Sequence, residues 1–286
     1  MAIVFPDRTW DAPAEGASRY LLLDGAQCHA PAQVLDRLPA SAIRLFDGVL
    51  ADGSADASVY LAVLPAELGM RRVLARIAAE ADSLGAATFL DSPLPSSELA
   101  QRLMRRLDAR FPNGKQFLAR FYDGRVLPLL AAVLRDPQRQ PFLSLGLAWH
   151  YVAADHTWQT LPLTALAHDP FVPPLELDSE QRRRLIDDSY PYTLIDHFRL
   201  TDRELLDRLP GPDQYRFFRA CVALADRYGM RDGGRILMVC TWALLSGEDF
   251  HEQPEWRKRL EDFAAGRRSA RQIGDEAYPM VEDWEE

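Results

Sequence analysis

The stretch FLARFYDGRVLPLLAAVLRD, residues 117–136, joins two apolar segments across a short charged turn. Residues 117–121 have the length and apolar character of a strand, and residues 126–134 place apolar side chains at helical spacing. The turn between them concentrates Arg120, Tyr122, Asp123 and Arg125. Because strand–turn–helix junctions often carry active sites, these four residues are the first candidates for function.

The same alternation of strand and helix continues on both sides of this junction. Strand-like segments span residues 19–24, 59–64 and 87–90, and residues 145–152 and 157–161 predict a closing hairpin that turns at 153–156. Helix-like segments span residues 31–38, 67–79 and about 96–107, the last with Ser96 or Ser97 as its N-cap. This order predicts an α/β N-terminal lobe with a mixed sheet flanked by helices.

The second half of the chain predicts an all-helical lobe. Helical patterns span residues 179–189, 194–209, 212–228, 236–245 and 254–263, with an interruption at Pro191. The expected division is an α/β domain over 1–165, a proline-rich linker over 166–175, a helical bundle over 176–270 and an acidic tail over 271–286.

Composition bounds the possible functions. The 286 residues are 48% hydrophobic, which suffices for a substantial core, and the formal net charge of −9 argues against a nucleic-acid partner. The apolar runs are shorter than the roughly 20 residues of a membrane span. Three cysteines without CxxC spacing indicate a reducing compartment, so a cytoplasmic location and no membrane partner are expected.

A search for chemistry finds no complete catalytic set. There is no glycine-rich phosphate loop after a strand and no metal-binding spacing of cysteine or histidine, so no cofactor, no metal and no catalytic residue are expected. In the turn, Asp123 is placed to cap the following helix. Arg125 should pair with Asp123, or with Asp24 or Asp91 at other strand ends, which leaves an ion-paired cap and a catalytic constellation as alternatives.

Four segments also resemble a known family. They are LLLDGA at 21–26, FLDSPLPSSEL at 89–99, FLARFYDGRVLPLLAAVL at 117–134 and ALLSGEDFHEQPEWRKRLED at 243–262. Together they resemble the type VI secretion effector chaperones, or adaptors, over about residues 18–265. The family's hallmark is an Arg-Phe-Tyr-Asp-Pro-Arg junction, and Gly124 here stands in place of the proline. Asp24, Gly25 and Gly124 are the structural positions of these motifs.

The resemblance implies a cytoplasmic, non-enzymatic protein that holds a toxic effector and helps load it onto the secretion spike. Its expected partners are the effector and, transiently, a spike protein. Contact residues are then sought among Arg120, Tyr122, Asp123, Arg125, Trp149 and Trp158, although the two tryptophans fit a hydrophobic core equally well. A hydrolase or transferase with an unidentified nucleophile, and a toxin-binding immunity protein, are the alternatives.

Overall fold

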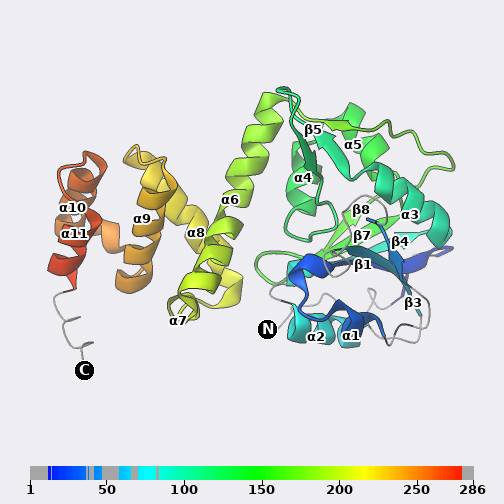
Figure 1. The fold of residues 1–286 in the computed structure, drawn as a ribbon, viewed down its shortest axis with the longest axis horizontal. Helices are drawn as coiled ribbons and strands as arrows, with labels where there is room; N and C mark the ends of the chain where they lie inside the picture. The colour runs from blue at the N-terminus through cyan, green and yellow to red at the C-terminus, as the bar shows by residue number, and fades with distance from the viewer. Residues whose placement is uncertain are drawn as a thin grey trace. The chain divides into compact units, whose positions relative to one another are not determined.

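The computed structural model describes residues 12–13, 15–36, 38, 42–46, 58–65, 70–81 and 84–278, and the chain divides into two compact units (Figure 1). Met1–Ser189 forms the first unit, and Tyr190–Glu286 forms the second. The described part of the first unit holds two β-sheets with helices, whereas that of the second holds helices only. The prediction of an α/β lobe followed by an all-helical lobe is therefore confirmed.

The main sheet has six strands in the order β2-β3-β1-β4-β7-β8, and all its neighbouring strands are antiparallel. The strands are β1 (Ser18–Asp24), β2 (Ile43–Arg44), β3 (Val59–Leu64), β4 (Ala87–Ser92), β7 (Ala148–Val152) and β8 (Trp158–Pro162). β3 and β4 each run antiparallel to β1, so they are parallel to each other with β1 between them. The main sheet is therefore antiparallel throughout, and the expected mixed sheet is wrong for it. A helical connection makes the two strands that it joins parallel, but it does not make them neighbours in the sheet.

A second sheet is mixed. Its order is β6-β5-β9, where β5 (Asp108–Arg110) pairs antiparallel with β6 (Gln116–Leu118) and parallel with β9 (Leu175–Glu176). The strand expected at residues 117–121 therefore ends at Leu118, and the next residues leave the sheet.

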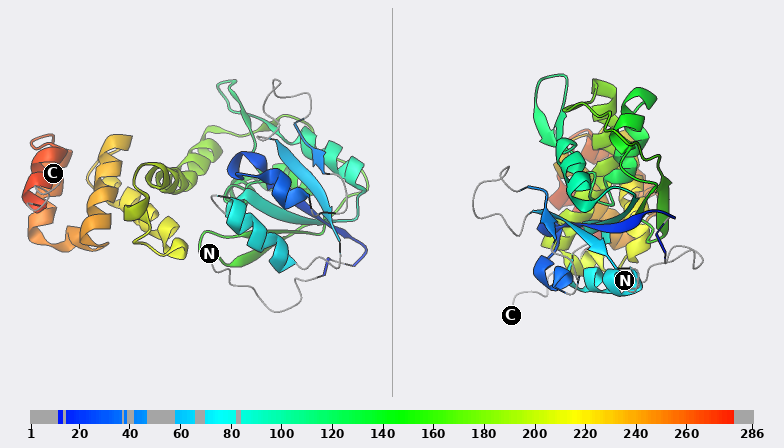
Figure 2. Two further views of the ribbon diagram at one scale, coloured as in Figure 1. Left: turned by 60° about the horizontal axis from the view of Figure 1, so that its bottom comes forward. Right: turned by 90° about the vertical axis from the view of Figure 1, so that its right-hand side faces the viewer.

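Helices cover both faces of the main sheet (Figure 1 and Figure 2). Leu21 and Leu23 of β1 face a core shared with α1 (Pro31–Leu35) and α2 (Met70–Glu80). Leu22 faces the opposite core, built with α3 (Ser96–Arg105), α4 (Leu127–Val133) and α5 (Asp136–Leu143). This two-sided burial accounts for the continuous apolar run in β1. The expected serine cap of α3 is wrong, because Pro95 is the N-cap and no side chain caps this end.

The second unit packs its helices around α9 (Gly233–Ser246), whose side chains Val239, Cys240 and Trp242 are buried. The other helices are α7 (Arg203–Leu206), α8 (Gly211–Arg227), α10 (Pro254–Ala264) and α11 (Ala270–Ala277). The predicted central helix at 236–245 lies within α9. The predicted acidic tail begins inside α11, and residues 279–286 lie outside the described residues.

The expected interruption at Pro191 is wrong, because α6 (Ser179–Thr201) continues through it. A proline inside a helix removes one backbone hydrogen bond, to the carbonyl four residues earlier. That carbonyl belongs to Asp187, an exposed residue, so water can replace the missing donor. In the described part of the chain, no helix has the length and apolar character needed to cross a membrane.

Candidate functional site

The charged turn belongs to a group of five side chains around two buried aspartates, which we call the acid–arginine cluster: Asp24, Gln27, Arg120, Asp123 and Arg125. Asp24 ends β1, and Gln27 follows it in a single 3-10 turn (Gly25–Gln27). The other three residues lie between β6 and α4. The side chains of Asp24 and Asp123 are only 2% and 1% exposed.

Asp24 holds its own turn and reaches across to the next one. Its Oδ1 accepts a hydrogen bond from the backbone N–H of Ala26 at 3.1 Å. Its Oδ2 accepts from Gln27 Nε2 at 2.7 Å and from Arg120 Nη2 at 2.8 Å. Gly25 is buried beside it and donates its N–H to the carbonyl of Ser58 at 3.0 Å.

Asp123 holds the turn that leads into α4, but the prediction that it caps this helix is wrong, because the N-cap of α4 is Val126 and no side chain caps that end. Within the turn, Asp123 Oδ1 accepts from the backbone N–H of Arg125 at 2.9 Å, and the carbonyl of Asp123 accepts from the N–H of Leu127 at 2.8 Å. Arg125 also pairs with this carboxylate through Nε at 3.1 Å and Nη2 at 3.0 Å. Of the three carboxylates considered from sequence, Arg125 therefore pairs with Asp123, while Asp91 binds Arg19 at 2.6 Å.

Two side chains join the two turns. Gln27 Nε2 lies 3.1 Å from Asp123 Oδ2 in addition to its bond with Asp24. Arg120 Nη2 lies 3.2 Å from the same oxygen. Every carboxylate oxygen in the cluster thus accepts at least one hydrogen bond, and two aspartates face two arginines. Such complete pairing is what makes burial of the two carboxylates tolerable, because an unpaired buried charge costs several kcal/mol.

Sequence reasoning missed two residues of this arrangement, Gln27 and Gly85. Gly85 accepts the N–H of Gly124 on its carbonyl at 2.8 Å. A Cβ atom at Gly85 would lie 2.7 Å from Arg125 Cγ, so only glycine leaves room for the arginine as it stands. Neither residue carries a motif of its own. Only their contacts with segments far away in the sequence reveal them.

The aromatic candidates lie in the core. Tyr122 packs edge-on against Phe46 and Phe121, with ring centroids 6.1 and 5.7 Å away. Trp149 is fully buried and donates from Nε1 to Thr88 Oγ1 at 3.1 Å, and Trp158 is stacked on His150. Both tryptophans are therefore core residues, which was one of the two positions that the sequence allowed, and neither ring is exposed to a partner.

Arg120 is the most exposed of the cluster's charged side chains, at 40%. Burial lowers the pKa of Arg120, but the carboxylates of Asp123 and Asp24 raise it by more. The net pKa therefore lies above the ordinary value, and the guanidinium stays charged. Burial raises the pKa of Tyr122 well above its usual range and the charge of Asp24 raises it too, while Arg120 lowers it, and the net pKa is high enough that the phenol stays neutral.

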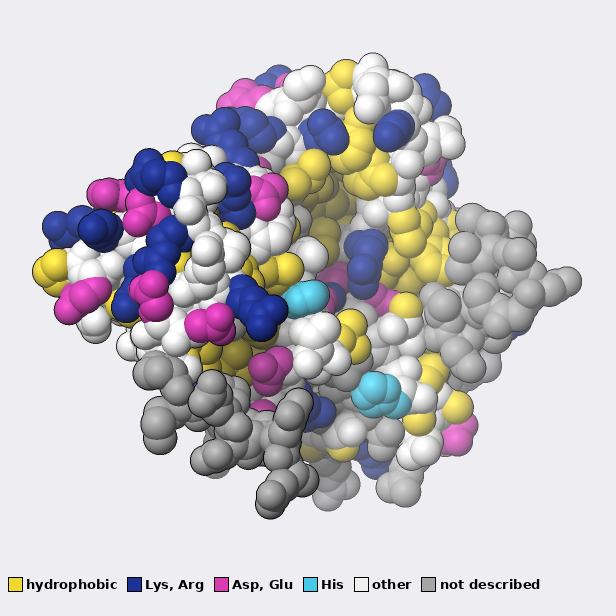
Figure 3. Space-filling model, turned by 60° about the vertical axis from the view of Figure 1, so that its left-hand side comes forward, with side chains coloured by type: hydrophobic (Ala, Val, Ile, Leu, Met, Phe, Trp, Pro, Cys, Tyr) yellow, Lys and Arg dark blue, Asp and Glu magenta, His cyan; other side chains and the backbone are white. Residues whose placement is uncertain are grey.

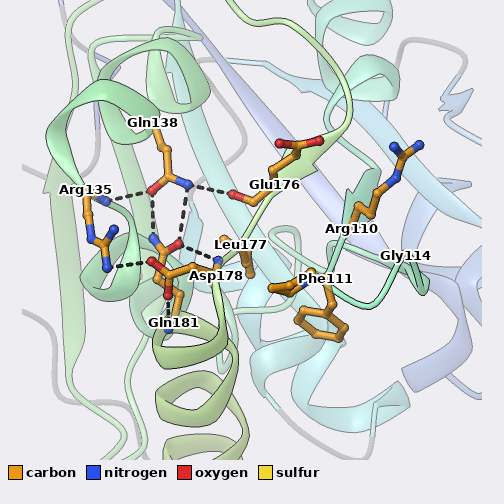
Figure 4. Close-up of a pocket in the computed structure, with 10 residues that line it drawn as sticks. Arg110, Phe111, Gly114, Arg135, Gln138, Glu176, Leu177, Asp178 and Gln181 are labelled. Carbon is orange, nitrogen blue, oxygen red and sulfur yellow. Dashed lines mark hydrogen bonds and ion pairs between the residues drawn. The ribbon is translucent and has the colours of Figure 1, made fainter.

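A cavity of about 510 Å³ lies elsewhere in the first unit, between the loop after β5 and the start of α6 (Figure 4). Gln138 and Gln181 exchange amide hydrogen bonds in its wall, and Arg135 pairs with Asp178 at 2.5 Å. Within the described residues, no group of three or more histidine, cysteine, aspartate or glutamate side chains could hold a metal ion.

Comparison with known proteins gives one match. Residues 19–141 match the model of a family described as a domain of unknown function, DUF4123. No curated protein and no solved structure matches the chain. The matched residues contain all five members of the acid–arginine cluster, together with Gly85 and Gly124.

Proposed function

We propose that this chain is a chaperone, or adaptor, that binds a type VI secretion effector in the cytoplasm and helps load it onto the secretion spike. Two findings support the proposal. The turn at residues 120–125 and three further segments resemble those of the effector chaperones. The family match over residues 19–141 includes that turn.

The observation that carries the proposal is the setting of Arg120. Its Nη2 is fixed by two buried carboxylates, yet its side chain is 40% exposed. A guanidinium that is held in place loses little conformational freedom on binding. Arginine is also among the residues most enriched at binding hot spots. Arg120 is therefore suited to anchor a partner on this face of the first unit.

The hydrogen bonding of the two aspartates fits a structural role in this proposal. Because both aspartate side chains are at most 2% exposed and are paired with arginines, neither is accessible to take a proton from a substrate. The cluster would instead fix the relative position of β1 and α4, and so the shape of the surface around Arg120. A specific interface of about 800 Å² per partner would suffice.

The test is co-purification with the toxin encoded by a neighbouring gene. We expect the wild-type chain to retain the toxin, and Arg120→Ala to weaken the complex by about 2 kcal/mol, as for a hot-spot arginine. The matched control is Arg139→Ala, an exposed arginine on α5. Equal retention by both variants, or no complex with the wild-type chain, would contradict the proposal.

A secretion assay separates a chaperone from an immunity protein. Deleting the gene from the attacking strain should abolish delivery of that toxin while leaving other effectors unaffected. If the deletion leaves delivery intact but makes the strain sensitive to incoming toxin, the chain is an immunity protein and the proposal fails.

A further inference from the structure

A polar pocket of about 320 Å³ lies within the helical unit, away from the region matched by the family model. It lies where α8 ends, where the 3-10 turn Phe250–Glu252 crosses, and where α10 begins. Its lining residues are Leu224, Arg227, Tyr228, His251, Glu252 and Arg257.

Three nitrogen-bearing side chains meet at this pocket. Arg227 Nη2 lies 3.4 Å from His251 Nε2. His251 Nδ1 lies 3.3 Å from the backbone carbonyl of Glu248, which can only accept a hydrogen bond, and Nε2 faces Arg227. Arg257 Nη2 donates to the carbonyl of Glu252 at 3.5 Å, a long bond for a charged donor.

These two arginines differ from most others in the unit. Ion pairs with a carboxylate are formed by Arg199, Arg203, Arg216, Arg231, Arg235, Arg267, Arg268 and Arg271. Figure 3 shows the same mixing of positive and negative side chains on the surface it displays. Within the described residues, neither Arg227 nor Arg257 forms such a pair, although both line one pocket.

The start of α10 adds to the positive potential. Arg257 lies in the first turn of this helix, whose N-cap, Gln253, makes no side-chain capping bond. The N-terminal end of a helix attracts negative charge, both through its dipole and through its uncapped N–H groups. The dipole of this helix end therefore acts in the same direction as the two guanidinium groups, while Glu255 in the same turn acts against it.

We propose that this pocket binds a carboxylate group of a peptide. Guanidinium groups pair with carboxylates through two parallel hydrogen bonds. The charges of Arg227, Arg257 and Glu252 sum to +1, which a single carboxylate balances. A phosphate dianion would exceed that charge, and Glu252 would repel it more strongly than it repels a singly charged carboxylate. The carboxylate can come from a peptide's C-terminus or from an acidic side chain.

The test is isothermal titration of the full chain with three acetylated tetrapeptides of alanine. One ends in a free carboxylate, one is amidated, and one is amidated with a glutamate at an internal position. We expect a carboxylate-bearing peptide to bind and the uncharged amidated peptide not to. Binding only of the free acid assigns the C-terminal group, and binding only of the internal glutamate assigns the side chain.

Two variants locate the binding. Arg227→Gln and Arg257→Gln should each weaken it about tenfold, the loss typical of one charge-assisted contact. Arg219→Gln removes an exposed arginine on α8 outside the pocket and should leave the affinity unchanged. Unchanged melting temperatures would show that the variants are folded.

The proposal is overturned if neither carboxylate peptide binds, if Arg219→Gln weakens binding as much as the pocket variants, or if inorganic phosphate binds more tightly than both peptides. It does not depend on the proposed chaperone function, because the pocket lies outside residues 19–141 and the titration contains no effector. Either proposal can therefore fail alone.

Discussion

Replacing Asp123 with alanine should destabilise the first unit by about 3 kcal/mol. Loss of the hydrogen bond from the backbone N–H of Arg125 costs about 1 kcal/mol. Loss of one partner from a fully buried ion pair costs about 3–5 kcal/mol, because the other charge is left unpaired. Arg125 remains 15% exposed and Arg120 40%, so water can partly solvate both after the change. We therefore expect the lower end of this range.

The matched control is Asp178→Ala. Asp178 Oδ1 accepts the backbone N–H groups of Glu180 and Gln181 at the start of α6, each at 2.9 Å. Asp178 also pairs with an arginine, Arg135, but these side chains are 39% and 61% exposed. Exposed ion pairs contribute little to stability, so this variant should lose clearly less stability than Asp123→Ala.

The assay is urea denaturation followed by circular dichroism, with separate transitions fitted if the two units unfold independently. The comparison tests the effect of burial, since both aspartates accept backbone N–H groups and both pair with an arginine. If Asp123→Ala costs no more than Asp178→Ala, the cluster does not stabilise the turn and the reasoning is refuted.

Three further predictions concern stability. Gly85→Ala should cost about 1–3 kcal/mol in urea denaturation, because its Cβ would lie 2.7 Å from Cγ of the pinned Arg125; a neutral effect would show that the arginine can move aside. Gly124→Pro removes an N–H that donates at 2.8 Å, so it should be about 1 kcal/mol less stable than Gly124→Ala. Equal melting temperatures of these two variants would refute this. Burial raises the pKa of Asp169, but its pairing with Arg106 lowers this pKa by more. The net pKa of Asp169 in the folded protein therefore lies below the ordinary value. The stability that charged Asp169 contributes to the folded protein is complete above about pH 4 and is lost as pH falls through the folded pKa. Asp169→Asn should therefore flatten the acid limb of stability against pH, and an unchanged limb would contradict this.

The main elements could be predicted from the sequence wherever local pattern determines them. The apolar run of β1 and the hairpin of β7 and β8 are strong local signals, as is the apolar α9. The order of strands in the sheet was not accessible. A strand that is buried on both faces has the same continuous apolar sequence in a parallel and in an antiparallel sheet. The position of β1 between β3 and β4 therefore cannot be inferred from the hydrophobic pattern.

The candidate site was accessible only in part. The pairing of Asp123 with Arg125 joins residues two positions apart and was one of the three pairings considered from the sequence, whereas the expected helix cap at Asp123 is not formed. The bridge formed by Gln27 joins side chains 96 residues apart, and no sequence pattern indicates such a contact. Burial of the two tryptophans was also undetermined, because a hairpin tryptophan is equally compatible with either face of a sheet.

Hydrogen–deuterium exchange of the chain, alone and mixed with the neighbouring toxin, tests the central claim most directly. That claim is that the acid–arginine cluster shapes a binding face around Arg120. The account predicts slower exchange in the complex for the amides of residues 118–127, with no comparable change in Arg120→Ala. Slower exchange confined to the helical unit, or identical exchange with and without the toxin, would contradict it.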